Sequence, residues 1–200
     1  MGPQATARDR LLDAAEDLAA TQGVTATPVD VILERAQVSP ATLYAHFGNK
    51  EGLITQALRR RLSRWDTTWQ ECVDEADGPE EKVLAIFTAL TRHRRNLSPS
   101  RWCVFLGIAA ETARPGPDLE DTLLADTRLL TRRLGELAAA LPDPDLPDPN
   151  RADAVAQHLV LIYTGVLGMI LRGTDADTAI TDGRSVAAMM LRAVGTRERT

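Results

Sequence analysis

The residues that could carry out acid–base, nucleophilic or metal chemistry are few and scattered along the chain. The three histidines stand in unrelated settings, with His46 near the N-terminus, His93 in a basic run and His158 in an apolar segment. Cys72 and Cys103 show no CxxC or Cys/His spacing, so neither a zinc site nor a disulfide framework is predicted. No HExxH, GxSxG, P-loop or dinucleotide motif occurs. We expect no catalytic site, metal or cofactor, and a small helical enzyme is the weakest alternative.

The distribution of charge singles out the N-terminal third. A net charge of −5 taken alone disfavours a nucleic-acid partner, because phosphate binding requires Lys and Arg. Residues 1–64 carry eight basic and seven acidic side chains, whereas residues 65–200 carry fifteen and twenty-one. Any DNA-facing surface therefore belongs to the N-terminal third. In the acidic remainder, Glu111 and Asp126 are candidate inward carboxylates, but paired surface charges explain them equally well.

Polar residues at helix starts between residues 27 and 50 predict two short helices joined by a tight turn. Thr27-Pro28 places a capping hydroxyl before a proline at the first helical position. Ser39-Pro40 repeats this pattern three residues after Ala36, and a longer helix begins at Lys50. A major-groove reader needs this arrangement. Short helix pairs are also common in all-α proteins, so the spacing alone leaves a packing role open.

The elements that position these residues are expected to be helices throughout. Aromatic residues make up only 4% of the chain, and no alternating Val/Ile/Thr pattern occurs, so the fold class is all-α. Helices are expected at 7–21, 28–36, 40–47, 50–73, 80–95, 100–113, 118–141, 151–172 and 181–194. The longest apolar stretch, Leu159 to Leu171, is too short for a bilayer, and no signal peptide is evident. We expect a soluble, cytoplasmic protein without a membrane partner.

Several runs between Arg10 and Leu58 carry a family resemblance. They are Leu11-Leu12-Asp13-Ala14-Ala15 with Gly23, Thr27-Pro28-Val29, Ala36-Gln37-Val38-Ser39, Thr42-Leu43-Tyr44-Ala45-His46-Phe47 and Asn49-Lys50-Glu51. Together these runs resemble the TetR family of bacterial regulators over about a quarter of the 200-residue chain. The resemblance implies an N-terminal three-helix, helix-turn-helix DNA-binding domain over 1–52. The helix from residue 50 would join it to a helical effector-binding and dimerisation domain over 53–200.

One position departs from the family pattern. The family usually has glycine where Gln37 stands, in the turn between the two short helices. A non-glycine residue at positive φ costs about 1 kcal/mol, so we expect a slightly strained or reshaped turn.

The second short helix is expected to face DNA with its N-terminal turns. Leu43 and Phe47 are its inward anchors, and its outward residues include no Arg, Asn, Gln or Lys. We therefore expect contacts with thymine methyl groups from Ala41 and Thr42, together with readout of DNA shape. The DNA-binding residues predicted are Thr27, Ser39, Pro40, Ala41, Thr42, Tyr44, His46 and Lys50.

Phosphate contacts are expected at the helix N-termini. Lys50 and Thr27 each combine a polar side chain with the first backbone amides of a helix, which suits a DNA phosphate. By resemblance Tyr44 and His46 are further phosphate ligands, and packing on the first helix is the alternative for each. Arg8 and Arg10 are placed beside the groove or at a solvated helix end.

A single recognition helix reads few base pairs, so such modules normally dimerise. The resemblance implies that the last two long helices of each copy form a four-helix interface. The predicted interface residues are Leu159, Ile162, Val166 and Ile170 on one helix and Val186, Met189, Met190 and Ala193 on the other. Gly165 and Gly168 would permit close backbone approach. The alternative is that these positions are core stripes of a monomer.

Large aromatic residues with polar tips in the middle of the chain suit a cavity for an apolar ligand. The candidates are Trp65, Trp69, Phe87, Thr91, Trp102, Cys103, Phe105, His158 and Tyr163, and ordinary core packing is the alternative for each. The resemblance implies a homodimeric repressor that binds a palindromic double-stranded DNA operator and is released by a small apolar effector. The alternative is an effector-independent DNA-binding or architectural protein.

Overall fold

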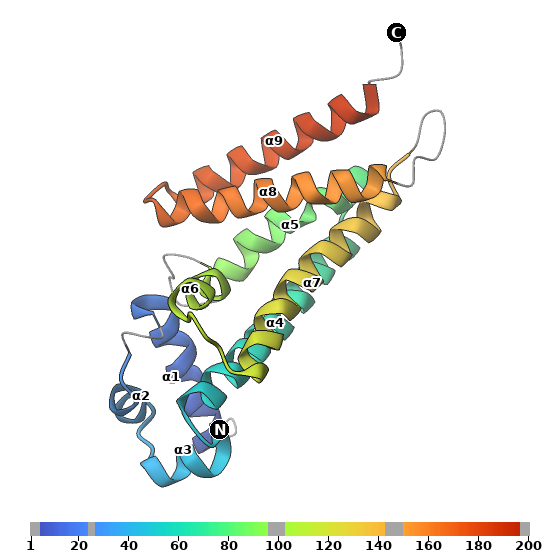
Figure 1. The fold of residues 1–200 in the computed structure, drawn as a ribbon. Helices are drawn as coiled ribbons and strands as arrows, with labels where there is room; N and C mark the ends of the chain where they lie inside the picture. The colour runs from blue at the N-terminus through green and yellow to red at the C-terminus, as the bar shows by residue number, and fades with distance from the viewer. Residues whose placement is uncertain (1–4, 24–26, 96–102, 143–149, 197–200) are drawn as a thin grey trace. The chain divides into compact units, whose positions relative to one another are not determined.

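The computed structural model describes residues 5–23, 27–95, 103–142 and 150–196, and their regular structure is helical (Figure 1). The helices are α1 (Ala7–Gln22), α2 (Val29–Ala36), α3 (Pro40–Phe47), α4 (Lys50–Asp74), α5 (Gly78–Arg95), α6 (Val104–Glu111), α7 (Pro117–Ala139), α8 (Arg151–Leu171) and α9 (Ala176–Thr196). These bounds confirm the all-α prediction. The expected residues 100–102 of α6 lie outside the described part of the chain.

The largest difference from the predicted bounds is at α9, which begins at Ala176 rather than at residue 181. Asp175 is the cause, because its Oδ1 atom accepts hydrogen bonds from the backbone N–H and the hydroxyl of Thr178, each at 3.0 Å. An aspartate three residues before a threonine is an N-terminal capping pattern that the sequence analysis missed.

The helices pack as two units. Unit 1 comprises Met1–Arg64 and Ser98–Asp126, and unit 2 comprises Trp65–Leu97 and Thr127–Thr200. Helices α4 and α7 each contribute residues to both units. The unit that contains the N-terminal helices therefore also includes α6 and the first part of α7. It extends beyond the domain of residues 1–52 that was expected from the sequence.

Unit 1 is built around one apolar core shared by α1 to α4, α6 and α7. Leu11 of α1, Leu43 of α3 and Leu53 of α4 are fully buried in it, and Ile108 of α6 is 2% exposed. The start of α1 has the predicted capping box, since Thr6 Oγ1 accepts a hydrogen bond of 3.1 Å from the backbone N–H of Asp9. Helix α6 is thus part of the same core as the helix-turn-helix.

Ion pairs also fix the first half of α4 on α1. Glu16 of α1 is 8% exposed, and its carboxylate accepts from Arg60 Nε at 2.6 Å and from Arg64. Arg60 also pairs with Asp13 Oδ1 at 2.6 Å. A buried carboxylate requires such partners, so this group links α1 to α4 by specific geometry.

In unit 2, α9 lies beside α8 and α5 (Figure 1). Gly183 of α9 faces both neighbours, because a Cβ atom there would collide with Val166 Cγ2 and lie 3.2 Å from Phe87 Cε1. Arg184 adds a polar link through a hydrogen bond of 3.2 Å to the carbonyl of Leu84. The three helices therefore pack closely at this point.

Helix α8 has more apolar length than the sequence analysis expected. Of the helices in the described residues, it is the one that is long and apolar enough to cross a membrane. It has 21 residues, and 33% of its most apolar segment is buried. One such helix is weak evidence for a membrane span, because the core helix of a soluble protein meets the same criteria.

Candidate nucleic-acid interface

The turn between α2 and α3 has the strained conformation predicted for Gln37. Its φ of 52° and ψ of 51° lie in the left-handed region, and no other described non-glycine residue has positive φ. The backbone N–H of Gln37 donates to Glu34 O at 3.1 Å, and that of Val38 donates to Leu33 O at 3.2 Å. These bonds satisfy the last carbonyls of α2 and offset the backbone strain, which is about 1 kcal/mol.

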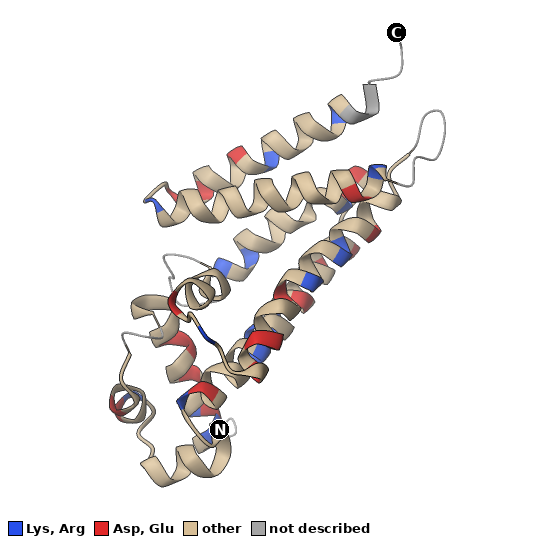
Figure 2. Ribbon diagram, viewed as in Figure 1, with Lys and Arg blue, Asp and Glu red and all other residues tan. Residues whose placement is uncertain are grey.

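Helix α3 begins as predicted, because Ser39 Oγ accepts from the backbone N–H of Thr42 at 3.4 Å. Leu43 is fully buried, which confirms that it anchors the helix, while Tyr44 is 55% exposed. Ser39, Pro40, Ala41 and His46 are exposed and Thr42 is half-buried. Figure 2 shows no Lys, Arg, Asp or Glu on α3. The open face of α3 is therefore polar but uncharged.

Lys50, at the start of α4, is half-buried. Burial lowers the pKa of its ammonium, and the nearby carboxylate of Glu111 opposes this shift. The first turn of α4 is capped by Asn49, whose Oδ1 accepts from the backbone N–H of Gly52 at 2.7 Å. A cation at a helix N-terminus fits an anion such as phosphate.

Thr27 does not occupy the position that the sequence predicted. The N-cap of α2 is Pro28, which makes no side-chain capping bond, so the predicted start is wrong by one residue. Thr27 is 2% exposed, and its hydroxyl donates to Gly23 O at 2.6 Å. The hydroxyl therefore ties the end of α1 to the start of α2, and it is not presented to a phosphate.

Two arginines suggested for the groove edge have packing contacts instead. Arg10 Nε donates to the carbonyl of Ala36 at 3.0 Å, and its Nη1 donates to Ala5 O at 3.1 Å. The guanidinium of Arg8 lies 5.7 Å from the ring centroid of Phe47. The last carbonyl groups of a helix have no partner within the helix, so they require donors from other parts of the chain. From the sequence, Arg10 of α1 was not recognised as such a donor.

The apolar stripe predicted to form the dimer interface on α8 lies mainly inside unit 2. Leu159, Val166 and Ile170 are at most 8% exposed, and Ile162 is half-buried. The interface prediction for the three buried residues is corrected accordingly, because they already pack within one copy. Periodicity identifies an apolar face but does not distinguish a core from an interface.

A different face of α8, together with α9, carries exposed apolar residues. Leu161 is 69% exposed, and the other large members are Met169, Leu171, Val186 and Met189, at 46–55%. Of the remaining predicted residues on α9, Ala193 is exposed and Met190 is half-buried. Cβ atoms added at Gly165 and Gly168 would meet no described atom within 4 Å.

The predicted ligand residues divide between the two units. In unit 2, the Trp65 ring lies 5.7 Å from Trp69, 5.4 Å from His93 and 6.1 Å from Tyr163, measured between ring centroids. Arg133 lies 5.0 Å from the Trp69 ring. Trp69 is fully buried, and its indole N–H has no hydrogen-bond partner among the described residues. We refer to Trp65, Trp69, His93 and Tyr163 as the aromatic cluster.

The other ligand candidates have separate environments. Phe105 is buried and Cys103 is half-buried in unit 1, and burial together with the charge of Asp126 raises the pKa of the Cys103 thiol to about 11. His158 is exposed on α8. Trp102 lies outside the described residues. The candidates thus do not form one site within either unit.

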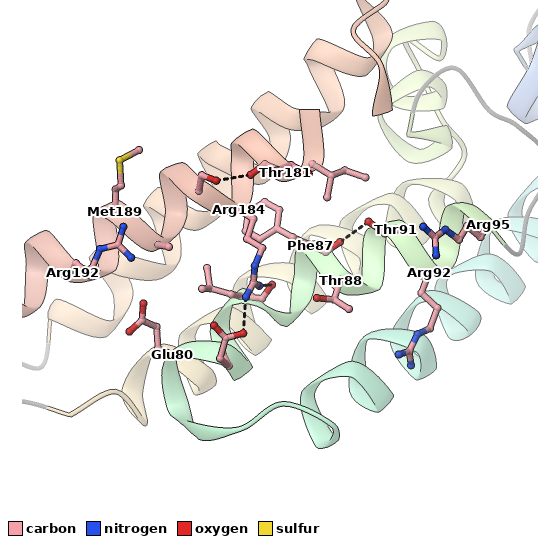
Figure 3. A pocket seen from close by; sticks show the side chains of 15 residues that line it. Glu80, Phe87, Thr88, Thr91, Arg92, Arg95, Thr181, Arg184, Met189 and Arg192 are labelled. Atoms are coloured by element: carbon pink, nitrogen blue, oxygen red, sulfur yellow. Dashed lines mark hydrogen bonds and ion pairs between the residues drawn. The ribbon is translucent and has the colours of Figure 1, made fainter. Parts of the chain in front are cut away.

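Phe87 and Thr91 border a groove between α5 and α9 with a volume of about 840 Å³ (Figure 3). Charged side chains line much of it, including Glu81, whose Oε2 accepts from Arg184 Nη2 at 2.6 Å. Glu80 and Arg192 lie toward one end in Figure 3. This polar lining does not fit the purely apolar ligand expected from the sequence.

Comparisons with known proteins agree with this architecture. Residues 11–57 match the family described as bacterial regulatory proteins, tetR family. The HTH-type transcriptional regulator YjdC of Escherichia coli K12 is 30% identical over 179 residues, which cover 86% of this chain and 88% of YjdC. The HTH-type transcriptional repressor KstR2 of Mycolicibacterium smegmatis is 35% identical over 85 residues, so the match spans only 42% of either chain.

The fold agrees over a greater length. The crystal structure of a TetR-family transcriptional regulator from Streptomyces coelicolor has a TM-score of 0.82 and 25% identity, and the match covers 94% of this chain and 95% of that one. The strained turn, the open face of α3 and these matches define a helix-turn-helix transcription regulator. The chain belongs to the TetR family of bacterial regulatory proteins, a family of regulators and not of enzymes.

Proposed function

We propose that this chain is a homodimeric transcriptional repressor that binds a double-stranded DNA operator through α3 and acts in the cytoplasm. The observation that carries the proposal is the open, uncharged face of α3, held on a buried base by Leu43. A helix of this kind enters the major groove with its N-terminal residues toward the bases.

The residues on α3 favour methyl contacts and shape over bidentate hydrogen bonds. Ala41 and Thr42 present methyl groups suited to thymine, and the Thr42 hydroxyl lies 3.0 Å from Ser39 Oγ. We assign phosphate contacts at the groove edge to Tyr44, His46 and Lys50. Sequence selectivity then depends strongly on DNA deformability and on the spacing of two half-sites.

Dimerisation is assigned to the exposed apolar residues of α8 and α9 and not to the buried stripe. A group of large exposed apolar side chains on neighbouring helices indicates an interface. The members of this group are Leu161, Met169, Val186 and Met189. Gly165 and Gly168 on α8 leave room for close approach of a second helix. A two-fold dimer with two α3 helices would bind a palindrome.

We assign to the aromatic cluster the binding of a small effector that releases the protein from its DNA operator. A buried indole N–H without a partner costs about 1–3 kcal/mol, so a largely apolar ligand with one acceptor atom would be stabilised at Trp69. Such a ligand releases DNA only if it binds the DNA-incompetent state more tightly. Compounds that raise the melting temperature would be tested for operator release, and stabilisation without release would contradict the coupling.

The DNA-binding proposal is tested by titrating duplexes enriched by the protein from a random pool. We expect Lys50→Ala and Tyr44→Ala each to weaken binding about tenfold or more at every sequence, because each removes a phosphate contact. Lys82→Ala is the matched control for Lys50→Ala, since it removes an exposed lysine from α5 of unit 2. Tyr44→Phe separates loss of the hydroxyl from loss of the ring.

Two outcomes would overturn this assignment. One is wild-type affinity for both alanine variants, and the other is an equal loss in Lys82→Ala. Thr42→Ala should change the sequence that the protein selects while keeping phosphate-dependent affinity, so an unchanged consensus would contradict base contact by Thr42.

A further inference from the structure

The groove between α5 and α9, which we refer to as the α5–α9 groove, lies within unit 2 (Figure 3). Its volume of about 840 Å³ is that of a small-molecule site, since such sites measure about 300–1,000 Å³. Leu84, Phe87 and Ile180 form its apolar base and are at most 5% exposed. Met189 of α9, which is 54% exposed, adds an apolar side chain. The groove therefore has an apolar surface for part of a ligand.

The α5–α9 groove is separate from the aromatic cluster. Thr88, Thr91 and Arg95 stand at positions i, i+3 and i+7 of α5, so they share the face that lines the groove. Of the described residues that line the groove, none belongs to the aromatic cluster. His93, the member of that cluster on α5, is buried. A ligand in the groove would therefore not occupy the effector site proposed above.

Ion pairs engage two of the arginines that line the groove. Arg184 Nη2 donates to Glu81 Oε2 at 2.6 Å. Arg92 donates from Nη1 and Nη2 to the two carboxylate oxygens of Glu75 at 2.9 and 2.6 Å. Arg95 is exposed in the last turn of α5, and no hydrogen bond or ion pair joins its side chain to a described residue. Its guanidinium is therefore available to an added anion.

The polar side chains of the groove favour an anion at one of its ends. Figure 3 shows Glu80 and Arg192 toward one end and Arg95 toward the other. Thr88 and Thr181 also line the groove, and both are exposed hydroxyl residues. A carboxylate or phosphate group is repelled by Glu80 and attracted by Arg95. Guanidinium and hydroxyl groups are suitable hydrogen-bond donors to such an anion.

We propose that the α5–α9 groove binds a small amphipathic anion, which is an apolar chain that ends in a carboxylate or a phosphate group. Arg95 binds the anionic head group together with the hydroxyls of Thr88 and Thr181, and the chain packs on the apolar base of the groove. The inference goes beyond the proposed function, because it assigns a second ligand site that depends neither on DNA nor on the aromatic cluster.

The test measures the binding of three probes to the 200-residue chain by isothermal titration calorimetry at constant ionic strength. The probes are octanoate, octyl phosphate and octanol, which share one apolar chain and differ in the head group. We expect saturable binding of octanoate, octyl phosphate or both, and the tighter anion identifies the head group. Arg95→Gln should weaken binding of that anion about fivefold, as for an exposed charged contact, and leave the affinity for octanol unchanged.

Arg172→Gln is the matched control. Arg172 is exposed at the end of α8, so both substitutions remove one positive charge from unit 2. The control should bind all three probes as the wild-type chain does. Arg95→Lys keeps the charge and should retain most of the affinity for the anion.

A bulky substitution tests where the anion binds. Thr88 is exposed and lines the groove, so Thr88→Trp places a large ring there. We expect it to weaken binding of the anion at least as strongly as Arg95→Gln does.

Three outcomes would overturn the proposal. The first is that neither anion shows saturable binding to the wild-type chain. The second is that Arg95→Gln weakens anion binding no more than Arg172→Gln, or weakens octanol binding equally. The third is wild-type affinity for the anion in Thr88→Trp, which would place the anion outside the α5–α9 groove.

Discussion

Exposed apolar residues are arranged differently in the two units. Among the described residues of unit 1 the large ones, Tyr44, Leu106 and Leu124, lie on three separate helices, α3, α6 and α7. In unit 2 they gather on the neighbouring helices α8 and α9. Single exposed apolar residues are normal on any surface, whereas a group of them indicates an interface. Of the two units, unit 2 therefore has the surface suited to a second copy.

The units also differ in how polar groups are used. In unit 1, the side chains of Glu16, Arg10 and Thr27 form hydrogen bonds that join the helices to one another. In unit 2, the indole N–H of Trp69 stays unpaired in the described structure. Unit 1 also has a buried polar atom without a partner among the described residues, Thr55 Oγ1, so the difference lies in the buried ion pair of Glu16 in unit 1. The following predictions test this difference and the arrangement of the exposed apolar residues.

The largest expected effect concerns the apolar face of α8. Leu161→Glu should weaken self-association at least about a hundredfold, because a charge would be placed in a desolvated contact. Leu124→Glu is the matched control, since Leu124 is an exposed leucine of unit 1. Sedimentation velocity should find a monomer for the first variant and a dimer for the second. A dimer in both would show that α8 is not the interface.

Removing a buried carboxylate should affect unit 1 next most strongly. Glu16→Gln removes the buried negative charge and one of the two acceptor oxygens that Arg60 and Arg64 use, so we expect a loss of about 2–3 kcal/mol in unfolding free energy. Glu136→Gln is the comparison in unit 2, where Glu136 and its partner Arg132 are both 61% exposed. There we expect a change within about 0.5 kcal/mol. Similar losses in denaturant titrations of both variants would contradict the contrast.

Two glycines should respond in opposite directions to substitution by alanine. Gly23 has φ of 84° and faces the Glu111 carboxylate, so Gly23→Ala should destabilise the protein by about 1–3 kcal/mol. Gly135 lies within α7 with no described atom near an added Cβ, so Gly135→Ala should stabilise that helix by about 0.5–1 kcal/mol. Thermal melting measures both, and the same sign for the two would contradict the assigned environments.

Stability should also depend on pH through Asp126 in unit 1. Burial raises the pKa of this carboxyl to about 6, above its ordinary value of 3.8. The folded protein therefore holds the proton more tightly than the unfolded chain, and stability is lost as the pH rises through 6. Asp126→Asn should raise stability at pH 7 by roughly 1–2 kcal/mol and have little effect at pH 4. A variant effect independent of pH would contradict this.

The sequence predicted the helices and the turn because local chemistry determines them. The Ser39-Pro40 start, the Thr6 capping box and the positive φ of Gln37 all depend on residues close together in the chain. Thr27 was misassigned because Pro28 rather than Thr27 is the N-cap, and the carbonyl of Gly23 takes the threonine hydroxyl.

What the sequence could not resolve depends on contacts between distant segments. The periodicity of α8 gives the same apolar stripe for a core as for an interface. The predicted interface residue Leu159 is buried, whereas Leu161, which had no predicted role, is exposed. Likewise, nothing local places the Gly116 N–H at Glu51 or Arg10 at the carbonyl of Ala36. These pairings are long-range, and a single sequence contains no direct record of them.

Dimeric DNA binding is tested most directly by the DNA that this 200-residue chain selects from a random duplex pool. A dimer with two α3 helices predicts an inverted repeat whose half-sites are separated by about one helical turn, 10–10.5 base pairs, or a multiple of it. Enrichment of such a repeat by the wild-type protein, and its loss in Leu161→Glu, is the expected result. Enrichment of a single unrepeated site, or of no sequence at all, would contradict a dimeric DNA-binding regulator.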